Sequence, residues 1–118
     1  IPTGMVETAN HKIAVANNNN RVEFFDLQGH STGTKIHFPA ALLKLVDCKG
    51  KLYAFCADGC LYRFTANGIT AKYKIPNFVE DVCKEVILQK YGDKLIMAFG
   101  KNVYLINNKG SIHEYFKK

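Results

Sequence analysis

Hydrophobic and polar residues follow one another along this chain in short runs that are typical of β-strands. Many runs are five to seven residues long and rich in β-branched and aromatic side chains, and turn residues interrupt them about every ten positions. No segment carries a sustained apolar stripe at helical spacing. The stretch from Pro76 to Tyr91 is compatible with one helical turn, although its second half fits a strand equally well. We therefore expect an all-β fold.

Several of the interruptions carry residues that favour hairpins. Asp58-Gly59 lies between two apolar runs, and a tight hairpin turn requires positive φ at both central residues. Asn18 and Asn19 can serve the same purpose, because Asn tolerates the left-handed conformation. Lys49-Gly50 joins the two runs on either side of it. These turns predict antiparallel strands connected by short loops.

The sequence repeats itself three times. Lys12, Lys51 and Lys94 occupy the same position in the aligned segments, with spacings of 39 and 43 residues, and the glycines that close the segments are spaced by 39 and 42. A period near 40 residues occurs in four-stranded propeller blades and in helical solenoids. Since no helical stripe is present, the solenoid is excluded.

Each repeat predicts four short strands, which together would form one blade. The expected strands cover residues 5–8, 12–16, 21–27 and 35–38, then 42–48, 51–56, 60–65 and 69–75, then 86–90, 94–99, 103–106 and 111–116. The repeats themselves cover approximately residues 4–38, 41–75 and 84–116 of a single segment, 1–118. The predicted fold class is a β-propeller-like array of three four-stranded antiparallel blades that form part of a larger propeller.

Two stretches resemble a known family. Val22 to Gly29 resembles the third-strand signature of WD-repeat β-propellers, with Phe25-Asp26 at the position of the Trp-Asp dipeptide. Asp58 to Phe64 is similar to the hairpin and third strand of a WD-repeat or quinoprotein-like blade. The second and third repeats have Phe64-Thr65 and Ile106-Asn107 at the dipeptide. The resemblance implies a propeller that presents loops and an outer rim to protein partners.

Three blades do not close a ring, because propellers typically have four to eight. We expect the missing blades to come from more of the same polypeptide, from a second copy or from another subunit, and the start at Ile1 favours a longer parent chain. The side chains expected on the two open faces are Ile13, Val15 and Val22 in the first blade and Leu95, Met97 and Leu105 in the third. The alternative fold is a closed small β-barrel or sandwich that serves as a binding domain.

The chain is basic, with a net charge of +6 and a pI near 9.2. Basic residues alternate with aromatic ones in the last strand of each repeat, which would form a basic rim of Lys35, His37, Lys72, Lys74, Lys117 and Lys118. Lysines on edge strands prevent those edges from pairing with other chains. An RNA-associated subunit that uses this rim is the alternative, although only two of the sixteen basic residues are Arg, which dominates base and phosphate recognition.

Candidate chemistry is sparse, and we predict no catalytic, cofactor-binding or metal-binding residues. His11, His30, His37 and His113 are scattered and show no metal-ligand spacing, and phosphate-binding glycine loops are absent. Asp26 and Asp58 fit local hydrogen bonding in turns. A quinoprotein-like enzyme would need a stacking Trp and acidic metal ligands, and the chain has no Trp. We expect a non-catalytic protein-interaction scaffold with no cofactor.

The four cysteines indicate a reducing compartment. Cys48, Cys56, Cys60 and Cys83 form no C-x-x-C pair, and they lie in apolar segments where free Cys behaves as a small hydrophobe. We expect buried reduced thiols in an intracellular protein, cytoplasmic or nuclear, and the alternative is a disulfide in a secreted chain. No apolar run approaches the roughly 20 residues that span a bilayer, so we expect no membrane association.

Overall fold

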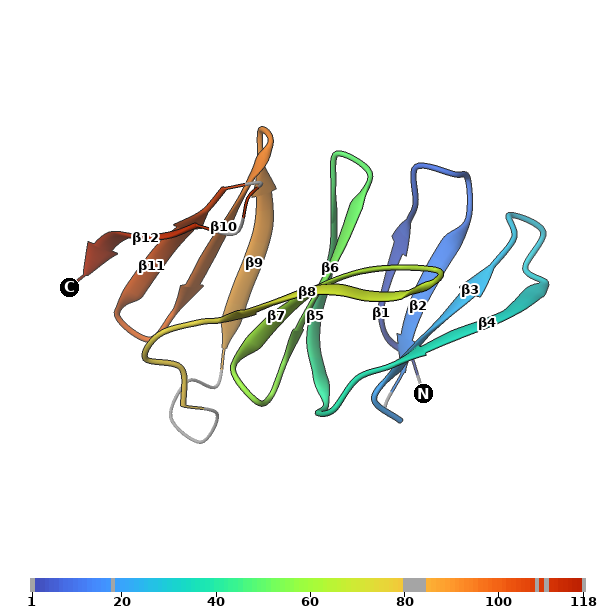
Figure 1. Cartoon of the computed structure of the whole chain (residues 1–118), viewed down its shortest axis with the longest axis horizontal. Coiled ribbons are helices and arrows are strands. Elements are labelled where there is room, and N and C mark those ends of the chain that lie inside the picture. Colours follow the sequence, from blue (N-terminus) through green and yellow to red (C-terminus); the bar gives the residue numbers. More distant parts are fainter. Residues whose placement is uncertain (1, 18, 80–84, 108, 110, 118) are drawn as a thin grey trace.

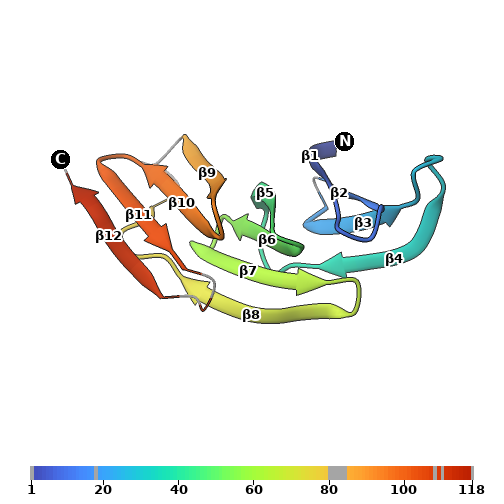
Figure 2. The same ribbon diagram turned by 90° about the horizontal axis from the view of Figure 1, so that it is seen from above.

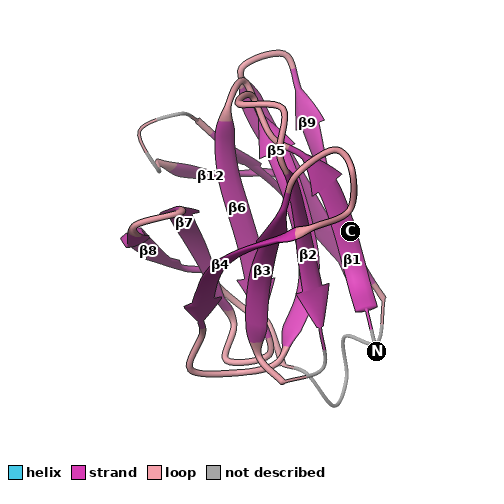
Figure 3. Cartoon of the chain, turned by 90° about the vertical axis from the view of Figure 1, so that its right-hand side faces the viewer, coloured by secondary structure: helices cyan, strands magenta, loops and turns pink. Residues whose placement is uncertain are grey.

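The computed structural model describes residues 2–17, 19–79, 85–107, 109 and 111–117, with the backbone alone for residues 2, 3 and 113–117. The described chain contains strands and loops and no helix (Figures 1 and 3). The strands are β1 (Pro2–Glu7), β2 (Ile13–Asn17), β3 (Arg21–Phe25), β4 (Ser31–His37), β5 (Leu42–Cys48), β6 (Lys51–Cys56), β7 (Cys60–Thr65), β8 (Gly68–Lys74), β9 (Val86–Tyr91), β10 (Lys94–Phe99), β11 (Asn102–Ile106) and β12 (Ile112–Lys117).

The strands form three antiparallel four-stranded sheets in chain order, which we call blade 1 (β1–β4), blade 2 (β5–β8) and blade 3 (β9–β12). The blades stand side by side in an open array that measures 45 × 29 × 20 Å (Figure 1). The first strands of the blades contact one another, β1 with β5 and β5 with β9, whereas β4, β8 and β12 form the outer edges (Figure 2). The first strands therefore line the inner side of the array.

Two apolar cores hold the array together, one on each face of blade 2. Between blades 1 and 2, Phe38 lies edge-to-face against Phe64, with ring centroids 5.2 Å apart. Between blades 2 and 3, Phe78 of the connecting segment lies edge-to-face against both Phe55 and Phe99, at 4.9 and 5.3 Å. No polar or charged residue among those described is fully buried. Each blade thus depends on its neighbour to cover an apolar face.

Turns and bulges explain why the sequence adopts this pairing. In the hairpin between β6 and β7, Gly59 has φ +80°, and the Cys60 backbone N–H donates to Asp58 Oδ1 over 3.0 Å. The third and fourth strands of every blade shift register once, between Glu23 and Phe25, between Arg63 and Phe64, and between Val103 and Tyr104. Such bulges increase the local twist of a strand pair.

The predicted strands are confirmed in number and order. Two of them begin well before the expected residue: β1 begins at Pro2 rather than residue 5, and β4 at Ser31 rather than residue 35. β8 and β11 each begin one residue early, and β3 ends at Phe25 rather than residue 27. The Ser-Thr-Gly-Thr start of β4 was not predicted as a strand, because a glycine within a strand weakens it. In the structure Gly33 has φ +84°. The closed barrel or sandwich is wrong, since the three sheets remain separate. The possible helical turn falls partly on residues 80–84, which lie outside the described residues.

Candidate interaction surfaces

The array leaves one apolar sheet face open at each end. The blade-1 face, which is the side of blade 1 turned away from blade 2, has an apolar groove of about 580 Å³ lined by Gly4, Met5, Ile13, Val15, Phe25 and Gly29. The blade-3 face is the side of blade 3 turned away from blade 2, and its apolar residues are Ile87, Ile96, Ala98, Val103 and Leu105. Met5 is 69% exposed and Ile87 is 52% exposed. Large apolar side chains are thus accessible at both ends.

Half of the residues expected on these faces are placed correctly. Ile13 and Val15 lie on the blade-1 face and Leu105 on the blade-3 face. The expectation was wrong for Val22, Leu95 and Met97, which are buried against blade 2. Alternation along a strand shows which residues share a face, but it does not show which face meets the neighbouring blade.

The basic rim residues lie on the outer strands of three separate sheets. Lys35 and His37 belong to β4, Lys72 and Lys74 to β8, and Lys117 to β12, while Lys118 lies outside the described residues. Lys74 Nζ donates to the Asp58 backbone oxygen over 2.9 Å, and Lys72 Nζ lies 6.0 Å from the centroid of the Tyr62 ring. These two lysines therefore also make contacts within blade 2.

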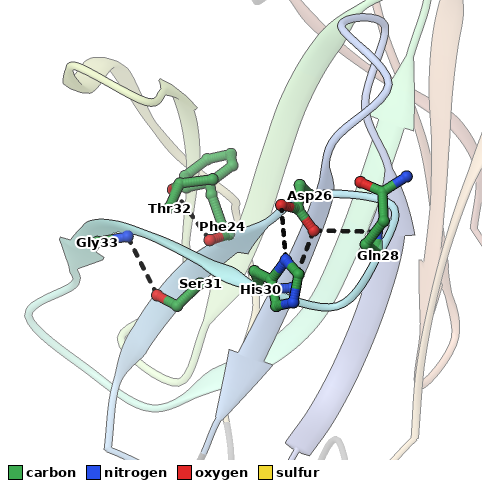
Figure 4. A network of polar contacts seen from close by, with 7 residues as sticks. All are labelled: Phe24, Asp26, Gln28, His30, Ser31, Thr32 and Gly33. Atoms are coloured by element: carbon green, nitrogen blue, oxygen red, sulfur yellow. Dashed lines mark hydrogen bonds and ion pairs between the residues drawn. The ribbon is translucent and has the colours of Figure 1, made fainter.

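The loop between β3 and β4 is organised by one carboxylate. Asp26 Oδ1 accepts the backbone N–H groups of Gln28 and His30, each over 2.9 Å, and Oδ2 lies 3.4 Å from His30 Nδ1 (Figure 4). The hydrogen bond from the His30 backbone is the main reason that the pKa of Asp26 is lowered. In the same loop, Thr32 Oγ1 donates to the Phe24 backbone oxygen (Figure 4). The local hydrogen bonding expected of Asp26 is confirmed.

One polar groove was not anticipated from the sequence. It has a volume of about 640 Å³ and lies at the turns that follow the first strand of each blade, where Glu7, Asp47, Lys49 and Lys90 meet. The only sequence signal there was the Lys49-Gly50 turn, and no motif connects these residues. Because β1, β5 and β9 are the innermost strands, the groove lies at one end of the inner side of the array.

The described cysteines are buried and free. They are Cys48, Cys56 and Cys60, whereas Cys83 lies outside the described residues. Burial raises the pKa of the Cys56 thiol to about 12, so this thiol stays protonated at neutral pH. The expected burial is confirmed for these three.

The described residues gather no group of three or more His, Cys, Asp or Glu side chains that could hold a metal ion. His11 lies 3.8 Å from Glu7 in the loop after β1, whereas His37 is exposed on β4. No helix in the described part of the chain is long and apolar enough to cross a membrane.

Comparison with solved structures decides the fold. Virginiamycin B lyase from Staphylococcus aureus superposes with a TM-score of 0.79 at 21% identity, over 98% of this chain and 41% of that chain. The chain is part of a β-propeller. BBS1N, solved in complex with ARL6DN, matches with a TM-score of 0.68 at 21% identity over 87% of this chain and 35% of that one. HIRA matches with a TM-score of 0.59 at 13% identity over 91% and 37%.

No protein-family model and no curated protein sequence matches the chain. The chain spans 35–41% of the length of these three structural neighbours. At such identities the likeness concerns the fold alone, and the propeller neighbours include both an enzyme and proteins that are not named as enzymes.

Proposed function

We propose that the chain is a non-catalytic protein-interaction scaffold: a WD-repeat-type propeller segment that further blades or a partner subunit complete. The observation that carries this proposal is the contrast between the blades. Blade 2 is covered on both faces by apolar cores, whereas blades 1 and 3 each have one covered and one open apolar face. An open apolar sheet face of this kind is typical of an interaction surface.

The structural neighbours support completion by more blades. Three blades of this chain match 41% of virginiamycin B lyase, which leaves room for about four more blades of the same size in that protein. BBS1N was solved in complex with ARL6DN, so a propeller of this shape engages a protein partner there. Further blades of this kind would cover the faces that blades 1 and 3 leave open.

The non-catalytic part of the proposal rests on the distribution of polar residues. The described residues gather no group of three or more His, Cys, Asp or Glu side chains that could hold a metal ion, and close pairs such as Asp26 and His30 are local partners within one turn. Burial raises the pKa of the Cys48 and Cys56 thiols, and a protonated buried thiol is a poor nucleophile. An intracellular location, cytoplasmic or nuclear, agrees with buried free cysteines and belongs to the same proposal.

Sedimentation equilibrium and hydrogen exchange on the isolated chain test the proposal. We expect concentration-dependent association, or else poor amide protection in blades 1 and 3, because each lacks a neighbour. A strictly monomeric chain with strong protection in all three blades would contradict the need for completion. A quinone bound to the purified protein, seen by absorbance, would contradict the non-catalytic role.

A further inference from the structure

The blade-1 face is divided into an apolar and a charged half. The apolar half contains Met5, Ile13, Val15 and Phe25 around the groove. The charged half lies next to it, toward the turn between β2 and β3. There Glu23 lies opposite Val15, Arg21 lies opposite Asn17, and their partners on the outer strand are Lys35 and His37.

No other blade carries charges at these positions. In the aligned repeats, Arg21 corresponds to Cys60 and Asn102, and Glu23 corresponds to Tyr62 and Tyr104. Tyr62 and Tyr104 are buried where each of their blades meets the preceding blade. The charged half of the blade-1 face is therefore specific to blade 1 and differs from the chain's own blade junctions.

The charges of this half are not balanced within the chain. Glu23 accepts a hydrogen bond from Ser31 Oγ over 2.7 Å and lies opposite Lys35. Arg21 lies opposite Asn17 and His37, and its Nε atom is buried without a hydrogen-bond partner among the described residues. A buried guanidinium nitrogen without an acceptor is unfavourable, and a carboxylate is its strongest partner. The surplus charge beside the apolar groove is thus positive.

A second copy of this chain does not match that requirement. The blade-3 face would have to cover the blade-1 face if two copies closed a six-bladed ring. Its described strand residues are apolar or uncharged apart from Lys94, which is a cation. Lys94 lies at the β9–β10 end of that face, whereas Arg21, at the β2–β3 hairpin end, would meet the β10–β11 hairpin end, where Ala98 pairs with Val103. Arg21 would then be buried against apolar side chains, with no carboxylate among the described strand residues of that face, which is costly.

We propose that the blade-1 face docks a blade of different sequence, which places apolar side chains over the groove and an Asp or Glu carboxylate over Arg21. This inference rests on the proposed function, because it assumes that a blade completes the propeller. It adds the chemistry of the occupant and excludes the chain's own blade 3.

Site-specific photocross-linking in the full-length protein, in the cells that produce it, tests the proposal. A benzophenone amino acid replaces Val15 in one variant and Leu105 in another, and the cross-linked peptides are identified by mass spectrometry. Each of these two cross-linking variants is also combined with Arg21→Glu. In a matched control it is combined with Lys51→Glu, which makes the same change of charge on blade 2. We expect the Val15 cross-link to reach a strand with an Asp or Glu close to the attached residue. Arg21→Glu should reduce this cross-link at least tenfold, Lys51→Glu should leave it unchanged, and reversal of the partner's acidic residue to Arg should restore it.

The other outcomes separate the two proposals. A Val15 cross-link to the blade-3 face of a second copy, or to a strand without an acidic residue, overturns the inference and leaves the proposed function standing. A cross-link from Leu105 but none from Val15 does the same. Absence of cross-links at both positions overturns both proposals. Arg21→Glu could lower the melting temperature so that charge reversal in the partner does not restore the cross-link. In that case His37→Glu, on the same face, replaces it as the charge-reversal variant. A Val15 cross-link that His37→Glu leaves unchanged then overturns the inference.

Discussion

At the scale of single residues, one position recurs with the same task in every blade. This position is Asp26 directly after β3, Thr65 at the end of β7 and Asn107 directly after β11, and each side chain accepts at least one backbone N–H group of the following turn. Asp26 receives two such bonds and Asn107 also receives two, of 2.9 and 3.0 Å. The polar residue at the end of the third strand therefore shapes a turn, and it is Asp in blade 1, Thr in blade 2 and Asn in blade 3.

The carboxylate makes this turn pH-dependent. The pKa of Asp26 is lowered in the folded chain, chiefly by the hydrogen bond from the His30 backbone. The stabilisation is therefore present above the unfolded pKa of about 3.9 and is lost as the pH falls through the lowered folded value. We expect Asp26→Ala to lower the melting temperature at pH 7 and to have a diminishing effect toward pH 3. Asp26→Asn should keep the turn, as Asn107 does, without that pH dependence. An effect of Asp26→Ala that is constant with pH would contradict this role.

A buried hydroxyl fixes the segment between blades 2 and 3. Tyr104 Oη donates to the Pro76 backbone oxygen over 3.1 Å and accepts from Asn77 Nδ2 over 2.8 Å. We expect Tyr104→Phe to reduce the free energy of unfolding by about 1–2 kcal/mol, because two hydrogen bonds are lost while the exposed Pro76 and Asn77 bond to water instead. Urea denaturation measures the change. The control is Tyr91→Phe, at a residue that is 67% exposed, which should change stability by less than about 0.5 kcal/mol.

At the scale of strands and hairpins, the sequence predicted most of the architecture. Asp58-Gly59 marked its hairpin correctly, although only Gly59, and not Asp58 as expected, has positive φ there. The period near 40 residues specified the number of blades. The start of β4 was missed, because Gly33 is unfavourable in strands and the segment carries no apolar residue, so its place comes from pairing with β3. A strand that forms because its neighbour pairs with it cannot be predicted from its own residues alone.

The Asp58-Gly59 hairpin should be the turn most sensitive to a methyl group. A Cβ on Gly59 would lie 3.1 Å from Lys74 Nζ and 3.4 Å from Phe78 Cδ2, in addition to the strain of φ +80°. Gly29 has φ +88° with open space around it, so it isolates the backbone term. We expect Gly29→Ala to cost about 1 kcal/mol and Gly59→Ala to cost more, up to about 3 kcal/mol. Equal losses in urea denaturation would show that crowding adds nothing.

At the scale of the whole molecule, the open faces were predictable as a need but not as a residue list. Three repeats cannot form a ring, and that alone predicts two uncovered faces. Their composition escaped prediction for a physical reason: β2 turns alanines toward blade 2 and larger residues outward, while β10 turns Leu95 and Met97 inward. The size of the side chains therefore does not show which face of a strand is buried. The charged half around Arg21 could not be predicted either, because strand pairing brings its residues together.

The basic rim gives a separate test at this scale. Lysines that contact phosphates should each reduce the salt dependence of RNA binding by about one unit of slope when reversed in charge. The rim cations belong to different sheets, and Lys74 is used by the Asp58 turn. We therefore expect Lys35→Glu and Lys72→Glu to change the slope for oligouridine no more than Lys12→Glu, a control outside the rim. A drop of about one unit for a rim variant alone would favour the RNA-associated alternative.

The strongest test of an incomplete propeller uses two neighbouring residues of β10 that face opposite sides. Leu95 is 2% exposed against blade 2, whereas Ile96 is half-buried on the blade-3 face. In the isolated chain, Leu95→Lys should cost at least about 3 kcal/mol, as expected for loss of a buried Leu side chain, and Ile96→Lys about 1 kcal/mol or less.

In the full-length protein the two variants should become alike. Once another blade covers the blade-3 face, Ile96 is buried too, and a lysine there is as unfavourable as one at position 95. The measurement is urea denaturation of both variants in both contexts, with Lys51→Gln as a control at an exposed position on blade 2. If Ile96→Lys leaves the free energy of unfolding of the full-length protein nearly unchanged, the blade-3 face is not covered there. A lysine at position 96 is tolerated only where its side chain keeps contact with water, and a blade packed on this face would remove that contact.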